Sequence, residues 1–276
     1  MIKNITLILL ITILSNLSFA FAITIDKFSR LINYPGKVEV PCPKQNPETA
    51  VILVIGQSNA ANHAAKKFVT RHPTQVFSYF NGKCFIASSP LLGASGTEGE
   101  FITPLADQLI DNGDYETVVI ISSAIGGTPI KLWQQGGELN AMLQGVLAEA
   151  KSKYKITEVI WHQGETDLGL KTGTANYIES FNSLVNSLGS MAEDRPPLFY
   201  AIATKCGKTA AWSANNSVAN AQRSLANPAN HIFLGVDTDR LLLEEDRNSD
   251  QCHFSEKGEL KTAAAFAKAI HEQKAK

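Results

Sequence analysis

Apolar runs of strand length recur along the chain, separated by stretches with helical periodicity. The runs are nearly continuous and rich in β-branched and aromatic residues, which is typical of strands covered on both faces in a parallel sheet. Five strands are predicted, at Val51–Ile55, Val118–Ile121, Val159–Trp161, Leu198–Ile202 and Ile232–Val236. Helices are expected at residues 103–112, 139–154, 174–191, 214–226 and 256–273. This alternation predicts a three-layer α/β/α sandwich around a central parallel sheet.

Polar blocks follow three of the predicted strands. Gly56-Gln57-Ser58-Asn59 follows the first strand, residues 122–128 follow the second, and residues 162–167 follow the third. Open parallel sheets bind their ligands beyond the carboxyl ends of the strands. We therefore expect the three blocks to meet at one rim of the sheet.

The first residues have the features of a secretory signal peptide. Lys3 supplies positive charge, Ile5–Leu14 is apolar apart from threonines, and Ala20-Phe21-Ala22 resembles a cleavage site. The alternative is an uncleaved membrane anchor, which the short apolar core disfavours. Residues 1–22 are therefore predicted to be removed, and residues 23–276 to form a single secreted or periplasmic domain without stable membrane insertion.

The charge balance excludes some classes of partner. Lys and Arg number 25 and Asp and Glu number 26, so the formal net charge is −1. Such a chain has no electrostatic footprint for nucleic acid or for an anionic membrane surface. A small neutral or weakly charged substrate fits better.

Four cysteines, Cys42, Cys84, Cys206 and Cys252, are present. An even number in an exported chain favours disulfides, and four cysteines allow three pairings. We favour Cys42–Cys84 with Cys206–Cys252, because the second pair would hold the loop that carries His253. Buried free thiols are the alternative, and no Cys-x-x-Cys spacing indicates a metal site.

Ser58 and His253 have the character of a nucleophile and its base. Ser58 ends an apolar strand, and Asp250 precedes His253 by three residues. A serine hydroxyl needs a base to remove its proton, and the imidazole needs a carboxylate to fix its tautomer. The simpler interpretation is that Ser58 caps a helix and His253 is a surface residue. Ala60 excludes the Gly-x-Ser-x-Gly elbow of α/β-hydrolases.

Three groups are candidates for stabilising an oxyanion. The N–H of Ser58 is free if a helix begins there, Gly127 offers an uncovered backbone N–H, and Gln163 offers a side-chain amide. A plain turn is the alternative for the glycine. Glu165 is expected to hydrogen-bond within its own loop, and Asn59 to support the site.

A metal site is not expected. His162 and Glu165 lack the second histidine of the metalloprotease helix motif. Four other histidines have no comparable motif around them and are interpreted as surface or packing residues: His63, His72, His231 and His271.

Taken together, the blocks resemble the SGNH-hydrolase superfamily, and within it the sialate O-acetylesterase-like family that also contains acetylxylan esterases. The matching blocks occur in the family order: Gly56-Gln57-Ser58-Asn59, Gly126-Gly127-Thr128, His162-Gln163-Gly164-Glu165-Thr166-Asp167, and Asp250 with His253. The resemblance implies a flavodoxin-like fold and a carboxylic ester hydrolase that needs neither metal nor other cofactor. Its substrate would be an acetylated sugar of the sialate or xylan type, cleaved through an acetyl-serine intermediate.

In this resemblance Ser58 is the nucleophile, His253 the general base and then acid, and Asp250 the orienting carboxylate. Glu165 could share the role of the acid. Other hypotheses are a carbohydrate-binding protein without catalysis and an esterase that acts on lipid or peptidoglycan esters. Trp133 and Trp212 could stack on a sugar ring or could be packing residues.

Overall fold

The computed structural model describes residues 22–189, 195–207 and 212–275, so the predicted signal peptide lies outside the described residues except for Ala22. Eight strands form one sheet in the order β10-β9-β8-β4-β7-β5-β6-β3, and β1 pairs with β2 separately. Neighbouring strands from β10 to β5 are parallel, whereas β6 and β3 continue the sheet in antiparallel pairing. The predicted α/β class is confirmed, with an antiparallel edge added to the parallel sheet.

The strands are short except for β4, which lies at the centre between β7 and β8. All residues of β4 are buried, as expected for a central strand covered on both faces. The strands are β1 (Thr24–Ile25), β2 (Leu31–Asn33), β3 (Glu39–Val40), β4 (Thr49–Gly56), β5 (Val76–Phe80), β6 (Lys83–Ile86), β7 (Thr117–Ser122), β8 (Glu158–His162), β9 (Leu198–Ile202) and β10 (Ile232–Asp237).

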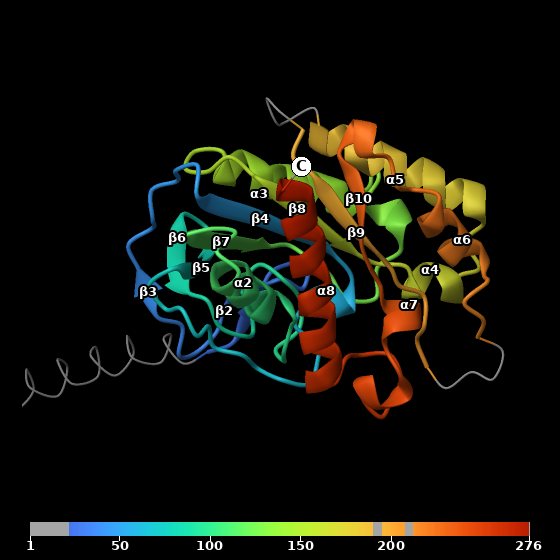
Figure 1. The fold of residues 1–276 in the computed structure, drawn as a ribbon, viewed down its shortest axis with the longest axis horizontal. Helices are drawn as coiled ribbons and strands as arrows, with labels where there is room; N and C mark the ends of the chain where they lie inside the picture. Colours follow the sequence, from blue (N-terminus) through green and yellow to red (C-terminus); the bar gives the residue numbers. More distant parts are fainter. Residues whose placement is uncertain (1–21, 190–194, 208–211, 276) are drawn as a thin grey trace, which may run out of the picture.

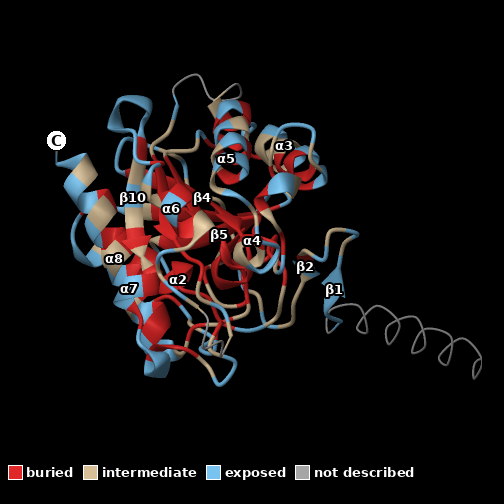
Figure 2. Cartoon of the chain, turned by 90° about the vertical axis from the view of Figure 1, so that its right-hand side faces the viewer, coloured by how far each residue is buried: buried red, intermediate tan, exposed pale blue. Residues whose placement is uncertain are grey.

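Helices cover both faces of this sheet. The α-helices are α2 (Ile102–Asp111), α3 (Glu138–Ala150), α4 (Glu165–Gly169), α5 (Thr174–Gly189), α6 (Ser217–Arg223), α7 (Thr238–Leu241) and α8 (Glu256–Lys274). Alternate residues of β4 point to opposite sides: Ile52 packs with α2 and α8, and Leu53 packs with α3, α5 and α6. Figure 1 shows these two helical layers on opposite sides of the sheet. Figure 2 shows the buried residues gathered in the sheet and on the helix faces toward it.

All five predicted strands are present, but β5 and β6 were not predicted. They form a hairpin whose two-residue turn is Asn81-Gly82. Both residues have positive φ, 48° and 79°, and Asn-Gly is the preferred sequence for such a turn. The sequence therefore contains a hairpin signal that the search for uninterrupted apolar runs does not detect.

The predicted helices are also present, most of them with a shifted end, and the end of the helix expected at residues 174–191 lies outside the described residues. The helix expected at residues 214–226 is shorter, because the Asn216 side chain accepts the N–H of Ala219 and begins α6 at Ser217. The helix expected at residues 139–154 ends at Ala150. The short helix α4 begins inside the polar block at Glu165, where a loop was expected.

Two disulfides join the pairs that the sequence analysis favoured. Cys42 is bonded to Cys84, and Cys206 is bonded to Cys252. The first bond connects the segment after β3 to β6 at the edge of the sheet. The second connects the segment after β9 to the residue that precedes His253.

A buried carboxylate lies where α8 packs against the chain after Ser58. Glu259 is fully buried; its Oε2 accepts the N–H of Lys66 at 3.0 Å, and its Oε1 has no hydrogen-bond partner within the described residues. Burial raises the pKa of the Glu259 carboxyl to about 9, opposed by the Lys66 hydrogen bond, and the nearby Glu100 raises it further. The folded protein therefore holds a proton that the unfolded chain releases at much lower pH.

The raised pKa of Glu259 predicts how the stability of the protein depends on pH. Because the folded pKa lies above the unfolded one, the contribution of Glu259 is complete below about pH 4.5 and is lost progressively up to about pH 9. Glu259→Gln cannot ionise. As the pH rises from 5 to 9, the free energy of unfolding of this variant should therefore increase relative to that of the wild type. Urea unfolding at several pH values measures this difference. Glu256→Gln, an exposed change on the same helix, should show no such trend; a parallel result for both variants would contradict the assignment.

Candidate active site

The turn after β4 brings Ser58 to the rim of the sheet. Gly56 has φ +131°, and a side chain there would collide with the backbone carbonyl of His162 on the adjacent strand β8. Only glycine therefore allows the two strands to end so close together. Ser58 begins a short 3₁₀ helix, Ser58–Ala60, so its own N–H has no partner within that helix.

The loop before α8 carries His253 and its carboxylate partner. His253 Nδ1 lies 2.7 Å from Asp250 Oδ2, and Asp250 Oδ1 accepts the backbone N–H groups of Cys252 and His253. Burial favours the neutral form of Asp250, but the hydrogen bonds from Cys252 and His253 outweigh it and hold the pKa of the carboxyl below its ordinary value. Asp250 is therefore an anion that fixes the orientation of the imidazole.

Asn59 links these two segments directly. Its Nδ2 donates to the carbonyl of Cys252 at 3.2 Å, and its Oδ1 accepts the N–H of Phe254 at 3.2 Å. The residue after Ser58 is thus bonded to both neighbours of His253. No hydrogen bond joins Ser58 Oγ to His253 in the described part of the chain. In sites without substrate such bonds are often long and tighten on binding.

The backbone of the loop after β7 supplies the second candidate donor. The N–H of Gly126 donates to Ser95 Oγ at 2.7 Å. The N–H of Gly127 donates to no group among the residues that the structure describes, and Gly127 is exposed with φ +70°. Of the two glycines, Gly127 is therefore the one whose N–H is free to bind an oxyanion.

Gln163 does not fit the expected role of an oxyanion donor. Its side chain is fully buried, and its Nε2 donates to Gln57, Thr128 and Asp167. Its Oε1 accepts the hydroxyl of Tyr177 at 2.9 Å. Both amide hydrogens are already used inside the protein, so the residue holds the loops together beneath the rim instead of facing a substrate.

Glu165 lies below the rim and supports Asn59. Its Oε1 accepts Asn59 Nδ2 at 2.9 Å, and its Oε2 has no partner within the described residues. Burial raises the pKa of the Glu165 carboxyl to about 7, against the opposing hydrogen bond from Asn59. Asp250, and not Glu165, contacts the ring of His253. Within the described residues, Glu165 is linked to the His253 loop through Asn59.

Two contributors to the site carried no recognised signal in the sequence. Arg247 is buried and donates to the carbonyl of Cys252 at 3.0 Å, beside Asn59. His63, interpreted above as a surface or packing residue, has its ring stacked against that of His253 with centroids 5.7 Å apart. Its position five residues after Ser58 was the only available clue.

The two tryptophans proposed as sugar platforms differ. Trp133 is fully buried, packs edge-on against Trp161 and donates its ring N–H to Thr128, so it is a core residue. Trp212 is half-buried, and Lys205 Nζ lies 5.5 Å from the centre of its ring. The residue after Lys205, Cys206, is bonded to Cys252 in the loop that carries His253. Only Trp212 remains a candidate for contact with a sugar.

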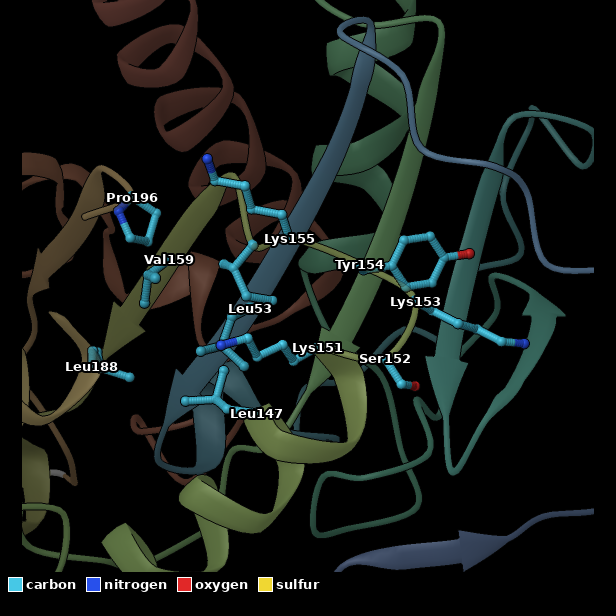
Figure 3. A pocket seen from close by; sticks show the side chains of 11 residues that line it. Leu53, Leu147, Lys151, Ser152, Lys153, Tyr154, Lys155, Val159, Leu188 and Pro196 are labelled. Atoms are coloured by element: carbon cyan, nitrogen blue, oxygen red, sulfur yellow. The ribbon is translucent and has the colours of Figure 1, made fainter. Parts of the chain in front are cut away.

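Other features lie away from this rim. A cavity of about 360 Å³ lies near the start of β8, at the opposite end of the strands from Ser58 (Figure 3). Three lysines line this cavity and give it a positively charged edge: Lys151, Lys153 and Lys155.

Among the described residues, no three His, Cys, Asp or Glu side chains are grouped to hold a metal ion. No helix in those same residues has both the length and the apolar character needed to cross a bilayer.

Solved structures share this fold at low sequence identity. A protein from Arabidopsis thaliana is similar with a TM-score of 0.60 at 20% identity, over 82% of this chain and 99% of that chain. NanS is similar with a TM-score of 0.53 at 19% identity, over 83% of this chain and 98% of its own. A carbohydrate acetylesterase from Xanthomonas citri is similar with a TM-score of 0.53 at 17% identity, over 81% of this chain and 56% of its own. No curated protein matches the chain.

The sequence of the whole region from the start of β4 into α8 matches one family. The model of that family, described as carbohydrate esterase, sialic acid-specific acetylesterase, matches residues 48–272. Such a family implies a carboxylic ester hydrolase that acts on acetyl groups of a carbohydrate. The rim that carries Ser58, Gly127 and His253 falls inside the match. The chain belongs to this carbohydrate esterase family.

Proposed function

We propose that the protein is a serine O-acetylesterase that removes acetyl groups from sugars of the sialate or xylan type. The observation that carries the proposal is the position of Asn59, which follows Ser58 and is hydrogen-bonded to both neighbours of His253. Asp250 holds the other side of the same imidazole. These contacts support a site in which Ser58, His253 and Asp250 supply the three residue types needed for nucleophilic acyl transfer.

The mechanism follows from the hydrogen bond between Asp250 and His253. With Nδ1 donating to the carboxylate, Nε2 is unprotonated and can take the proton of the Ser58 hydroxyl as Oγ attacks the acetyl carbonyl. As the tetrahedral intermediate collapses, the imidazolium gives this proton to the departing sugar oxygen, which leaves as a hydroxyl. A water, activated by the same imidazole, hydrolyses the acetyl-serine and restores the enzyme.

Two backbone groups are proposed to stabilise the oxyanion, the N–H of Ser58 and that of Gly127. Backbone donors in a fixed turn need no reorganisation when the negative charge develops, which makes them effective in a partly dry site. The Gln163 side chain is left out because its donors are engaged below the rim. Its contribution is to hold the loop that follows β8.

The proposed site of action is outside the cytoplasm, secreted or periplasmic. Two disulfides join all four cysteines, and such bonds persist in oxidising compartments. Metal independence stays a prediction, as does the cleavage of residues 1–22.

Ser58→Ala tests the proposal. Because the variant lacks the nucleophile, kcat for acetate release should fall on the order of 10⁴- to 10⁶-fold. Acetate release should be measured from acetylated sialic acid, acetylated xylan and 4-nitrophenyl acetate. Ser152→Ala, an exposed serine at the opposite end of the strands, is the matched control and should not change the rate. An active Ser58→Ala protein would refute the serine mechanism.

A pair of carboxylate variants identifies the acid that orients His253. Asp250→Asn should lower kcat on the order of 10⁴-fold, because the neutral amide no longer fixes the required tautomer. Glu165→Gln keeps an acceptor for Asn59 and should lose much less activity. Steady-state kinetics of both purified variants decide the assignment; a larger loss in Glu165→Gln would transfer the role to Glu165.

The two disulfides provide another matched comparison. They close loops of similar length, with sequence separations of 46 and 42 residues. Each double Cys→Ser variant should therefore lose a similar stability, about 4 kcal/mol in the chain-entropy model. Only the Cys206/Cys252 variant should also lose kcat when both proteins are still folded, because Cys252 precedes His253. Circular dichroism and acetate release at low temperature test this. Equal activities would show that this bond does not position the histidine.

A further inference from the structure

The backbone around His63 is fixed on both sides of the site. The N–H of Asn62 donates to the carbonyl of Ser95 at 2.9 Å, and Ala64 forms a bridge with Gly99. The N–H of Ala65 donates at 2.9 Å to the carbonyl of Phe254, the residue after His253. His63 is therefore anchored between the segment that carries Ser95 and the loop that carries the proposed base.

The ring of His63 fills a space that two glycines leave open. A Cβ atom at Gly126 would lie 2.7 Å from His63 Nε2, and one at Gly96 would lie 2.8 Å from it. On its other side the ring is stacked against His253, with an angle of 22° between the two planes. A side chain at Gly126 would meet the imidazole first and would displace it, whereas one at Gly96 would first collide with the backbone carbonyl of Asn62 at 2.3 Å.

A short hydrogen-bonded chain runs from His63 to the oxyanion loop. His63 Nε2 lies 3.1 Å from Ser95 Oγ, and the same oxygen accepts the N–H of Gly126 at 2.7 Å. The next residue is Gly127, whose N–H is the proposed oxyanion donor. One end of this chain therefore touches the base, and the other end fixes the peptide beside the donor.

We propose that His63 is a positioning residue for the esterase reaction, which through Ser95 fixes the Gly126–Gly127 loop and sets the direction of the Gly127 N–H. This inference rests on the proposed function. The ring also packs against His253 and limits its movement.

The electrostatics of His63 agree with this role. Burial lowers the pKa of His63, and the adjacent His253 lowers it further, against an opposite effect of Glu98. His63 is therefore neutral near neutral pH. A neutral ring can stay stacked while His253 carries the positive charge that it acquires during the reaction, whereas a second cation would oppose that step.

Variants of His63 and Ser95 test the proposal on 4-nitrophenyl acetate. His63→Phe keeps a flat ring against His253 but removes the hydrogen bond, and Ser95→Ala removes the hydroxyl between His63 and Gly126. Each should lower kcat roughly 10- to 100-fold, less than the loss of about 100- to 1,000-fold for a deleted oxyanion donor, with KM nearly unchanged. His63→Gln retains a hydrogen-bonding group and should restore most of kcat. His231→Asn, in an exposed turn with positive φ that precedes β10, is the control.

The double variant His63→Phe/Ser95→Ala distinguishes a shared chain from two separate effects. If both residues act through Gly126, the double variant should lose little more than the worse single variant. Unchanged kcat in both single variants, multiplicative losses in the double variant, failure of His63→Gln to recover, or a rise in KM alone would each overturn the proposal. Ser95→Ala keeps the test valid if thermal unfolding shows that His63→Phe is misfolded. Failure of the proposed function is a separate result, because it would appear as activity in Ser58→Ala.

Discussion

The hydrogen bonds of Asn59 are the constraint on which the site depends. The side chain is fully buried, donates to Glu165 and to the carbonyl of Cys252, and accepts from Phe254. A buried amide that lost these partners would cost about 1–3 kcal/mol for each unsatisfied group. The short helix after β4 and the loop before α8 are therefore held in one relative position. The segments that carry Ser58 and His253, nearly two hundred residues apart in sequence, are thereby joined through Asn59.

The same arrangement places poorly satisfied polar groups inside the protein. Both ring nitrogens of His162 and one oxygen of Glu165 have no hydrogen-bond partner within the described residues. Burial, together with the charge of Arg247, lowers the pKa of His162 to about 3, while burial raises that of Glu165 to about 7. The histidine is therefore neutral, and the acid is readily protonated, so the interior carries less charge than its composition indicates. Polar groups with this cost are typical of functional sites, where stability is sacrificed for a fixed geometry.

The sequence predicts the elements better than it predicts the contacts between them. Continuous apolar runs identify β4, β7, β8 and β9 because strands buried on both faces have few other compositions. The apolar run of β10 is also recognisable, although this edge strand is only partly buried. The blocks after these strands meet at one rim because parallel strands end on the same side. The Asn81-Gly82 hairpin was missed because polar residues interrupt its apolar strands, Ser78 in β5 and Lys83 in β6. The role proposed for His63 could not be recognised, because it depends on contacts with Ser95, Gly126 and His253, which are distant in sequence. Trp133 has the residue type of a sugar platform, but its burial is decided by packing against Trp161.

Gln163 shows why a suitable residue in a suitable motif does not by itself determine a role. An amide at the end of β8 can point outward to a substrate or inward to the loops below. Inside the protein it meets Gln57, Thr128, Asp167 and Tyr177, and these partners use its donors and its acceptor together. Turning the Gln163 side chain outward would leave several buried polar groups unpaired at once. The free-energy cost of these unpaired groups exceeds the stabilisation from one additional hydrogen bond to an oxyanion. Among the described residues, the backbone N–H groups of Ser58 and Gly127 face no such competition, because neither donates to another group of the protein. The Gln163 amide therefore holds the loops, and the donors proposed above for the oxyanion are the backbone N–H groups of Ser58 and Gly127.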